Sequence, residues 1–305
     1  MGAYLAQRSA QMVVVIFGVV TVTFFVIRLV PGDPARLMEP PGTPESVIQL
    51  VRAQIGTNKP VPVQYGEFLG SLLRGDLGRS FRGGRPVREI IARALPNTLA
   101  LGAVSMLVAT ALAGGLGIAA ALRPHGRLDR AVAVLVSLAQ ATPNFWLGVM
   151  LVLLFAIQLR WLPAIDMAGP SSFVLPVTTL VVTMLPLLVR TFRQGFIEAL
   201  GEDFVRAARA RGIPDRRILL VHVMKVAAIP LVTVLGIQAG FVLGGAVVVE
   251  SIFNWPGIGT VALTAIQSRD FPVVQGTVLV IAAIFTLATF VVDLVYAALD
   301  PRIKY

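Results

Sequence analysis

Six long runs of apolar residues divide the chain, and polar segments separate them. The first run, AQMVVVIFGVVTVTFFVIRLV, follows Arg8; it is long enough to cross a bilayer and lacks a small-x-small cleavage site, so we interpret it as an uncleaved span. Because a helix needs about 20 apolar residues to cross the hydrocarbon core, the pattern predicts an all-α polytopic membrane protein with six transmembrane helices. We expect Pro176 and Pro186 to interrupt the fourth run. The later runs begin near Pro96, Ala131, Phe173, Ala227 and Pro272.

The polar stretch between the first two runs contains prolines, glycines, mixed charges and only short amphipathic pieces such as PESVIQLVRAQIG and PVREIIARAL. This composition predicts an extramembrane segment with a few short helices. The chain then divides into an N-terminus with the first span, an extracytoplasmic segment, a five-span core that includes a cytoplasmic loop at 199–226, and a cytoplasmic tail. These four parts are residues 1–30, 31–94, 95–298 and 299–305.

Lysine and arginine gather beside the short loops on one side of the predicted bundle. Fourteen of them lie on that side, eight within residues 190–225, whereas the opposite short loops hold Arg160 and Arg269. The positive-inside rule therefore places both termini and the 190–225 loop in the cytoplasm. The nine basic residues of 31–94 do not weigh against this orientation, because loops longer than about 60 residues escape the rule.

The composition supports a membrane protein and narrows its chemistry. The 305 residues are 56% hydrophobic and 14% charged, and the mean hydropathy of +0.81 lies outside the range of soluble domains. The net charge of +10 resides in loops between spans, so it indicates membrane orientation rather than a nucleic-acid partner. With no cysteine and only His125 and His222, far apart, we expect no disulfide and no metal site.

No motif predicts catalysis in this chain. The phosphate-binding pattern GxxxxGK[ST] is absent, so we expect no ATPase site here. Serines have no histidine in a motif context that would mark a base, and carboxylates have no acid–base spacing, so no catalytic residue is expected. The GGLGIAA run at 114–120 lies inside an apolar span without a preceding strand, which favours close helix packing over dinucleotide binding.

Two polar features lie inside predicted spans. In the third, LAQATPNFWLG places Gln140, Thr142 and Asn144 around a proline, as broken helices along translocation pathways do; a proline kink satisfied by neighbouring helices explains it equally well. In the last, Asp293 is an ionisable residue within the membrane, and such residues often have a function. It also lies near enough to the cytoplasmic end to reach the interface or an interhelical polar partner.

A charged segment, EDFVRAARARGIPDRRILLVHVMKVAAIP, separates the fourth and fifth runs. Apolar residues recur at helical spacing at Phe204, Val205 and Ala208; Gly212 then stops the helix and Pro214 begins a second one. A basic amphipathic helix can lie on anionic lipid. Here the apolar face is small and the Gly-Ile-Pro turn makes a projecting elbow, which favours docking into a protein partner.

These residues resemble the permease subunits of bacterial ABC importers of the dipeptide, oligopeptide and nickel group. The charged segment is similar to the cytoplasmic EAA loop of that family, with the alanine pair at Ala207 and Ala208 and the glycine at Gly212; Arg206 stands where the motif has its glutamate. The further matches are RLVPGDPA (28–35), GDLGRSF (75–81), LPNTLALG (95–102), TPNFWLG (142–148), ESIFNWPGIGTVALTAIQSRDFPVVQG (250–276) and LDPRIKY (299–305).

The resemblance implies a type I ABC importer permease fold in a bacterial cytoplasmic membrane. It implies a heterodimer with a homologous second permease, two ABC ATPase subunits or domains that bind the ATP and magnesium, and an extracytoplasmic substrate-binding protein on the 31–94 segment and the loop from Phe253 to Asp270. The charged segment would be a coupling helix that docks on an ATPase. By position, its docking candidates are Asp203, Arg206, Ala207, Ala208, Gly212 and Ile213.

The predicted function is import of dipeptides or oligopeptides, with nickel, haem or glutathione as alternative cargo of the same machinery. A secondary carrier or channel that needs no ATPase is a rival. It predicts intramembrane charges or an inverted repeat, and the sequence offers one candidate charge and no evident repeat. A purely structural membrane anchor does not account for the basic elbow.

Overall fold

The structure is a computed structural model that describes residues 2–29, 32–40, 42–164 and 169–299. Within these ranges the chain is helical apart from turns, loops and one isolated bridge between Arg79 and Pro86. The helices are α1 (Gly2–Leu29), α2 (Pro34–Met38), α3 (Glu45–Ile55), α4 (Val61–Leu73), α5 (Val87–Ala121), α6 (Arg127–Ala141), α7 (Asn144–Leu151), η1 (Val152–Gln158), η2 (Pro170–Phe173), α8 (Val174–Gly201), α9 (Asp203–Ala210), α10 (Asp215–Arg217), η3 (Ile218–Val223), α11 (Met224–Ile252), α12 (Ile258–Gln267) and α13 (Phe271–Leu299).

The described helices account for the six predicted spans. Four are long and apolar enough to cross a membrane as single helices, and they lie in α1, α5, α8 and α13. Two bent pairs supply the others: Arg127–Ala141 meets Asn144–Gln158 at 96°, and Asp215–Ala228 meets Pro230–Val242 at 56°. Counting each bent pair as one span gives six, as the hydrophobic pattern predicts.

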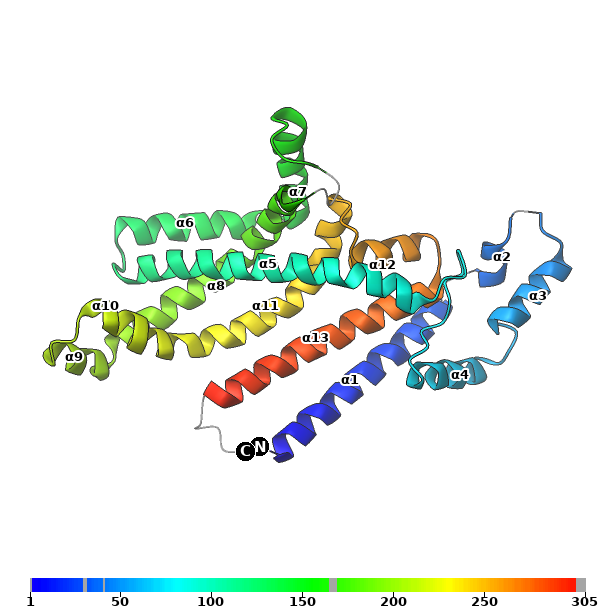
Figure 1. The fold of residues 1–305 in the computed structure, drawn as a ribbon, viewed down its shortest axis with the longest axis horizontal. Coiled ribbons are helices and arrows are strands. Elements are labelled where there is room, and N and C mark those ends of the chain that lie inside the picture. Colours follow the sequence, from blue (N-terminus) through cyan, green and yellow to red (C-terminus); the bar gives the residue numbers. More distant parts are fainter. Residues whose placement is uncertain (1, 30–31, 41, 165–168, 300–305) are drawn as a thin grey trace.

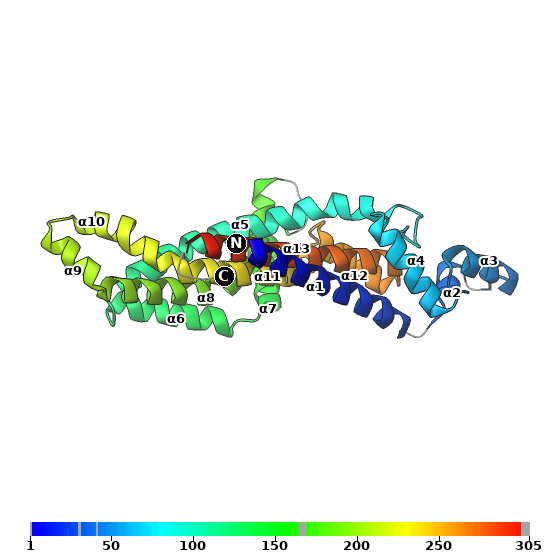
Figure 2. The ribbon, with the colours of Figure 1, turned by 90° about the horizontal axis from the view of Figure 1, so that it is seen from below.

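The bundle is elongated, with different structures at its two ends. Figures 1 and 2 show α9 and α10 at one end and α2, α3 and α4 at the other, with the long helices between them. α8 packs against α5, α6 and α11, while α13 lies between α11 and α1. The basic elbow and the polar N-terminal segment are therefore separated by the length of the spanning helices.

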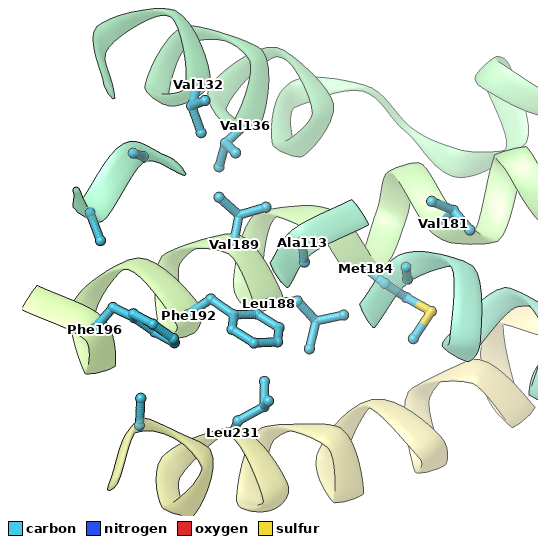
Figure 3. Packing of buried hydrophobic residues seen from close by; sticks show 14 of the residues in the cluster. Ala113, Val132, Val136, Val181, Met184, Leu188, Val189, Phe192, Phe196 and Leu231 are labelled. Atoms are coloured by element: carbon cyan, nitrogen blue, oxygen red, sulfur yellow. The ribbon is translucent and has the colours of Figure 1, made fainter. Parts of the chain in front are cut away.

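α8 is the central helix of the bundle. Of its most apolar stretch, 61% is buried, compared with 17% for α1, so α8 is surrounded and α1 is peripheral. Figure 3 shows Phe192 and Leu188 of α8 beside Ala113 of α5 and Leu231 of α11. A Cβ built on Gly117 would lie 2.6 Å from the Cβ of Phe192, so the predicted packing role of the 114–120 run is confirmed.

The prediction that prolines interrupt the fourth span was wrong. α8 is continuous from Val174 to Gly201 and includes both Pro176 and Pro186. Pro176 lies in the first turn, where a missing N–H removes no intrahelical bond. Pro186 lies in the interior, where burial against neighbouring helices holds the helix together across one lost bond.

The half of the core away from α9 and α10 also differs from the expected organisation. α5 begins at Val87, so the PVREIIARAL piece and the second span form one helix that continues through Pro96. Asn97, the next residue of α5, bonds to a segment outside the helix: its Nδ2 donates to the Pro256 carbonyl at 2.8 Å, and its backbone carbonyl accepts from Trp255 Nε1 at 3.1 Å. The short apolar helix α12, which the sequence pattern did not predict, follows Trp255 and Pro256 in the chain.

Candidate functional site

The charged segment forms two short helices around a glycine turn, as predicted. α9 ends at Ala210, Arg211 caps it, and Gly212 adopts a left-handed φ of 71°. Its N–H donates to the Arg209 carbonyl at 2.9 Å, and the Ile213 N–H donates to the Ala208 carbonyl at 3.2 Å. This pair of bonds is the Schellman motif, which needs a residue that tolerates positive φ. Pro214 then precedes α10.

An apolar inner face attaches this elbow to the bundle. Val205 is fully buried, and Ala208 and Ile218 are also buried and belong to the main hydrophobic core. Phe204 and Ile213 pack against the same core while half-buried. The elbow is therefore packed on the body of the protein and is not a free loop, so a force on it reaches the spanning helices directly.

The outer face of the elbow is charged and exposed. Arg209 Nε donates to Asp215 Oδ1 at 2.9 Å and so joins the two short helices. Arg206 Nη1 lies 3.4 Å from Asp203 Oδ1, and both side chains are mostly in solvent. Surface pairs of this kind contribute little stability, which leaves these groups available to a partner.

Four of the six predicted docking residues lie on this outer face. Asp203, Arg206, Ala207 and Gly212 are exposed. A Cβ built at Gly212 meets no atom within 4 Å, so any side chain there would project outward. Ala208 is buried on the inner face, where it supports the elbow instead of presenting a surface.

An ion pair next to the elbow joins α6 to α8. Asp129 is 5% exposed; it accepts from Arg193 Nε at 2.6 Å and Nη2 at 2.9 Å, and from the His125 backbone N–H at 2.8 Å. The apolar pattern places Asp129 just before the third run, which begins near Ala131, and Arg193 among the cytoplasmic charges of 190–225. Asp129 and Arg193 are 64 positions apart, so no local sequence pattern predicts that they form an ion pair.

The break between α6 and α7 brings together some of the predicted pathway residues. Gln140 and Thr142 line a cavity of about 240 Å³ with Thr183, Arg190 and Gln238. Arg190 Nη2 donates to Gln140 Oε1 at 2.7 Å. From the sequence, Arg190 is predicted only as an orientation signal, and Gln238 has no predicted role.

The two remaining polar candidates lie elsewhere. Asn144 is outside this cavity: its Oδ1 accepts from the Phe145 backbone N–H at 2.7 Å at the start of α7. Asp293 lies in α13, but its side chain is outside what the structure describes. Its predicted role as an interhelical polar partner therefore stays a prediction.

A buried glutamate joins three helices on the side of the bundle away from the elbow. Glu250 of α11 is fully buried; it accepts from Thr98 Oγ1 of α5 at 2.6 Å and from the N–H groups of Gly259 and Thr260 in the first turn of α12 at 2.7 and 3.3 Å. Thr98 Oγ1 in turn accepts from the Ile258 N–H at 2.8 Å. The carboxylate thus stabilises the N-terminus of α12, where backbone N–H groups favour negative charge. The sequence pattern predicts no role for Glu250.

The N-terminal polar segment packs near the loop that precedes α13. Asp270 is buried and accepts hydrogen bonds from Ser80 Oγ and from the Phe81 backbone N–H. The segment borders a cavity of about 860 Å³ that α1 and the start of α13 also line. Within the segment, Arg52 donates hydrogen bonds to the carboxylates of Asp33 and Glu45, and those to Asp33 contribute most to raising the pKa of Arg52. The two regions expected to receive an extracytoplasmic partner therefore adjoin.

Comparison with known proteins gives matches over nearly the whole chain. The family described as binding-protein-dependent transport system inner membrane component matches residues 113–305, and the N-terminal membrane component of such systems matches residues 1–102. The glutathione transport system permease protein of Salmonella typhi is 38% identical over 302 residues, or 99% of both chains. The probable peptide ABC transporter permease protein y4tP of Sinorhizobium fredii is 35% identical over 313 residues, or 100% of both.

A solved structure shares the fold. An inward-facing conformation of the MetNI methionine ABC transporter matches with a TM-score of 0.57 and 19% sequence identity, over 70% of this chain and 97% of that chain. The shared part is thus nearly all of the shorter chain. At this level of identity the likeness concerns the helical architecture.

Proposed function

Because the chain belongs to the family of inner membrane components of binding-protein-dependent transport systems, we propose that it forms half of the translocation pathway of an ATP-driven importer of dipeptides and oligopeptides. It is a multi-pass protein of the bacterial inner membrane, and the family works with ATPase, substrate-binding and second permease partners. In our proposal the second permease is a homologue that forms a heterodimer with this chain.

The elbow carries the coupling part of this proposal. Its inner face is packed on the core through Val205 and Ala208, and its outer face exposes Asp203, Arg206 and Ala207 around the Gly212 turn. We assign this outer face to docking on an ATPase subunit, with Ile213 at its edge. A rigid, packed elbow transmits ATP-driven movement of the partner to the spanning helices, and rigid-body rocking is a common route to alternating access.

The absence of a GxxxxGK[ST] motif fits a chain that obtains its energy from partners. Two ATPase subunits or domains would bind the ATP and magnesium, and this chain would hold no catalytic residue. Both termini and the elbow would then face the cytoplasm, while the α2–α4 segment and the loop before α13 would receive the substrate-binding protein outside.

The names of the two relatives guide the choice of cargo. One relative is a probable peptide permease and the other a glutathione permease, and glutathione is itself a tripeptide. Short peptides are thus the class that both names share. Nickel and haem are the alternative cargo for machinery of this kind.

Affinity purification of the tagged chain from mild detergent, followed by mass spectrometry and an ATPase assay, tests this function. We expect a second permease and an ATPase to co-purify, and hydrolysis to rise when a peptide-loaded binding protein is added. A chain that purifies alone and moves solute without ATP would instead be a secondary carrier.

A further inference from the structure

We propose that Arg190 binds the carboxylate of a transported peptide, in the polar cavity beside the break between α6 and α7. The inference rests on the proposed function, since it names the chemical group that the same pathway recognises. The cavity has a volume of about 240 Å³, and the polar residues that line it are Gln140, Thr142, Thr183, Arg190 and Gln238.

The position of Arg190 along α8 indicates an aqueous surface. It lies 16 residues after Val174 and 11 residues before Gly201, which at 1.5 Å per residue is about 24 Å and about 16 Å from the two ends of the helix. The residue is nonetheless exposed on this chain. Arg190 lies within a helix that is long and apolar enough to span the membrane, and a charged side chain in such a helix is costly beside lipid and usually faces the bundle interior or a water-filled cavity.

The charge of Arg190 is not compensated by a carboxylate among the described residues. Its one described hydrogen bond goes from Nη2 to the neutral amide oxygen of Gln140. Arg193, one turn further along the same helix, is held by both carboxylate oxygens of Asp129. Two neighbouring arginines of α8 therefore differ: one is used to join helices, and the other retains N–H donors for a ligand.

The lining of the cavity suits an anionic group. The residues that border it include no aspartate or glutamate, so nothing there competes with a bound carboxylate. Gln238 is buried at 6% exposure, and its Nε2 lies 3.4 Å from the Met184 carbonyl. A guanidinium binds a carboxylate through two parallel hydrogen bonds, which gives both strength and orientation.

A terminal carboxylate is the group that fits a peptide pathway. Every unmodified peptide ends in one whatever its side chains, so a site for it accepts many sequences. Pockets for drug-sized ligands have volumes of about 300 to 1,000 Å³. A cavity of about 240 Å³ is smaller, so it suits one terminal residue better than a whole oligopeptide. The same positive charge repels a bare metal cation, so the site favours peptide cargo over nickel ions.

Uptake by the reconstituted complex tests the inference. Proteoliposomes would hold this chain with its partner permease and ATPases, supplied with binding protein and ATP, and the probes are dialanine and dialanine amide. We expect Arg190→Gln to lower dialanine uptake about 10- to 100-fold, the range for losing hydrogen bonds to a charged group, and to change uptake of the amide less than about threefold. Arg190→Lys should fall between wild type and Arg190→Gln, because it keeps the charge and loses the two-bond geometry.

Two further variants sharpen the result. Gln140→Glu adds a carboxylate to the side chain that Arg190 already contacts, so it should lower dialanine uptake as Arg190→Gln does. Arg130→Gln removes an exposed arginine from α6 outside the cavity, so uptake of both probes should match wild type. Saturation-transfer NMR of dialanine on the purified complex without ATP reports binding independently of turnover, and its signal should be lost in Arg190→Gln.

Three results would overturn the carboxylate site. These are equal loss of dialanine and its amide, an NMR signal that Arg190→Gln leaves unchanged, and failure of Arg190→Gln to co-purify with the partner permease, which would make Arg190 an interface residue. A wild-type complex that takes up neither probe with ATP would contradict the proposed function itself. The two failures are thus distinct.

Discussion

Arg193 donates to both carboxylate oxygens of Asp129, from Nε at 2.6 Å and from Nη2 at 2.9 Å. The pair joins the start of α6 to the C-terminal half of α8, the helix that leads directly into the elbow. Asp129 is 5% exposed and also accepts from the His125 N–H. A displacement of the elbow therefore reaches α6 as well as α8, so the two helices should move together.

Breaking this pair should destabilise the protein. Asp129→Asn keeps the shape of the side chain but leaves Arg193 without its counter-charge, and we expect a loss of about 2 kcal/mol because the guanidinium remains partly solvated. Thermal unfolding in detergent measures it, and Arg130→Gln on the same helix serves as the control. An unchanged midpoint in Asp129→Asn would show that the pair is not needed for stability.

Bulk at the glycine turn should uncouple transport from ATP hydrolysis. Gly212 has open space around its Cα, so the side chain in Gly212→Trp would project onto the outer face of the elbow. We expect uptake to fall about tenfold or more, which corresponds to about 1.4 kcal/mol of lost docking free energy. Membrane insertion should be normal. Gly212→Asn is the matched control, because asparagine tolerates the left-handed conformation and is small. Normal uptake by Gly212→Trp at equal expression would contradict the docking assignment.

The two neighbouring alanines of α9 should behave differently. Ala207 is exposed and Ala208 is buried against the core. Ala207→Leu should weaken association with the ATPase and leave the unfolding midpoint unchanged. Ala208→Leu should destabilise the chain by about 1–3 kcal/mol through overpacking. Pull-down of the ATPase and thermal unfolding, measured on both variants, separate the two effects; identical behaviour would mean that the elbow is packed differently.

Loss of the Glu250 carboxylate should loosen α12. Glu250→Gln replaces an acceptor of three hydrogen bonds with an amide whose NH₂ faces N–H donors, at a cost of about 2 kcal/mol. Since the chain has no cysteine, Ala265→Cys supplies a single reporter at a buried position of α12. Its labelling rate should rise several-fold in Glu250→Gln and stay unchanged with Ser251→Ala, an exposed neighbour.

The proposed orientation predicts opposite accessibility at the two ends. Ala53→Cys in α3 and Ala210→Cys in α9 place single thiols at exposed positions. In intact cells a membrane-impermeant maleimide should label the first, and only permeabilised cells should allow labelling of the second. Labelling of Ala210→Cys in intact cells would reverse the topology.

Several features could be predicted because they depend on neighbouring residues. The length of an apolar run predicts a membrane span. Gly212 followed by Pro214 ends one helix and begins another, and this depends on no distant part of the chain. The same local rule failed at Pro186, where burial of α8 on several sides holds the helix together. The search for long apolar runs also missed α12, because this helix is too short to cross a membrane.

The sequence by itself determined the six spans, the bias in orientation, the elbow and the family resemblance, since hydrophobicity, charge and helix breakers act over a few residues. Only the tertiary structure decided that Asp129 binds Arg193, that Thr98 binds Glu250, and that Gln140 meets Arg190 beside a cavity. These partners are 64, 152 and 50 positions apart. Their proximity depends on how α5, α6, α8 and α11 pack, and that packing is a property of the whole bundle.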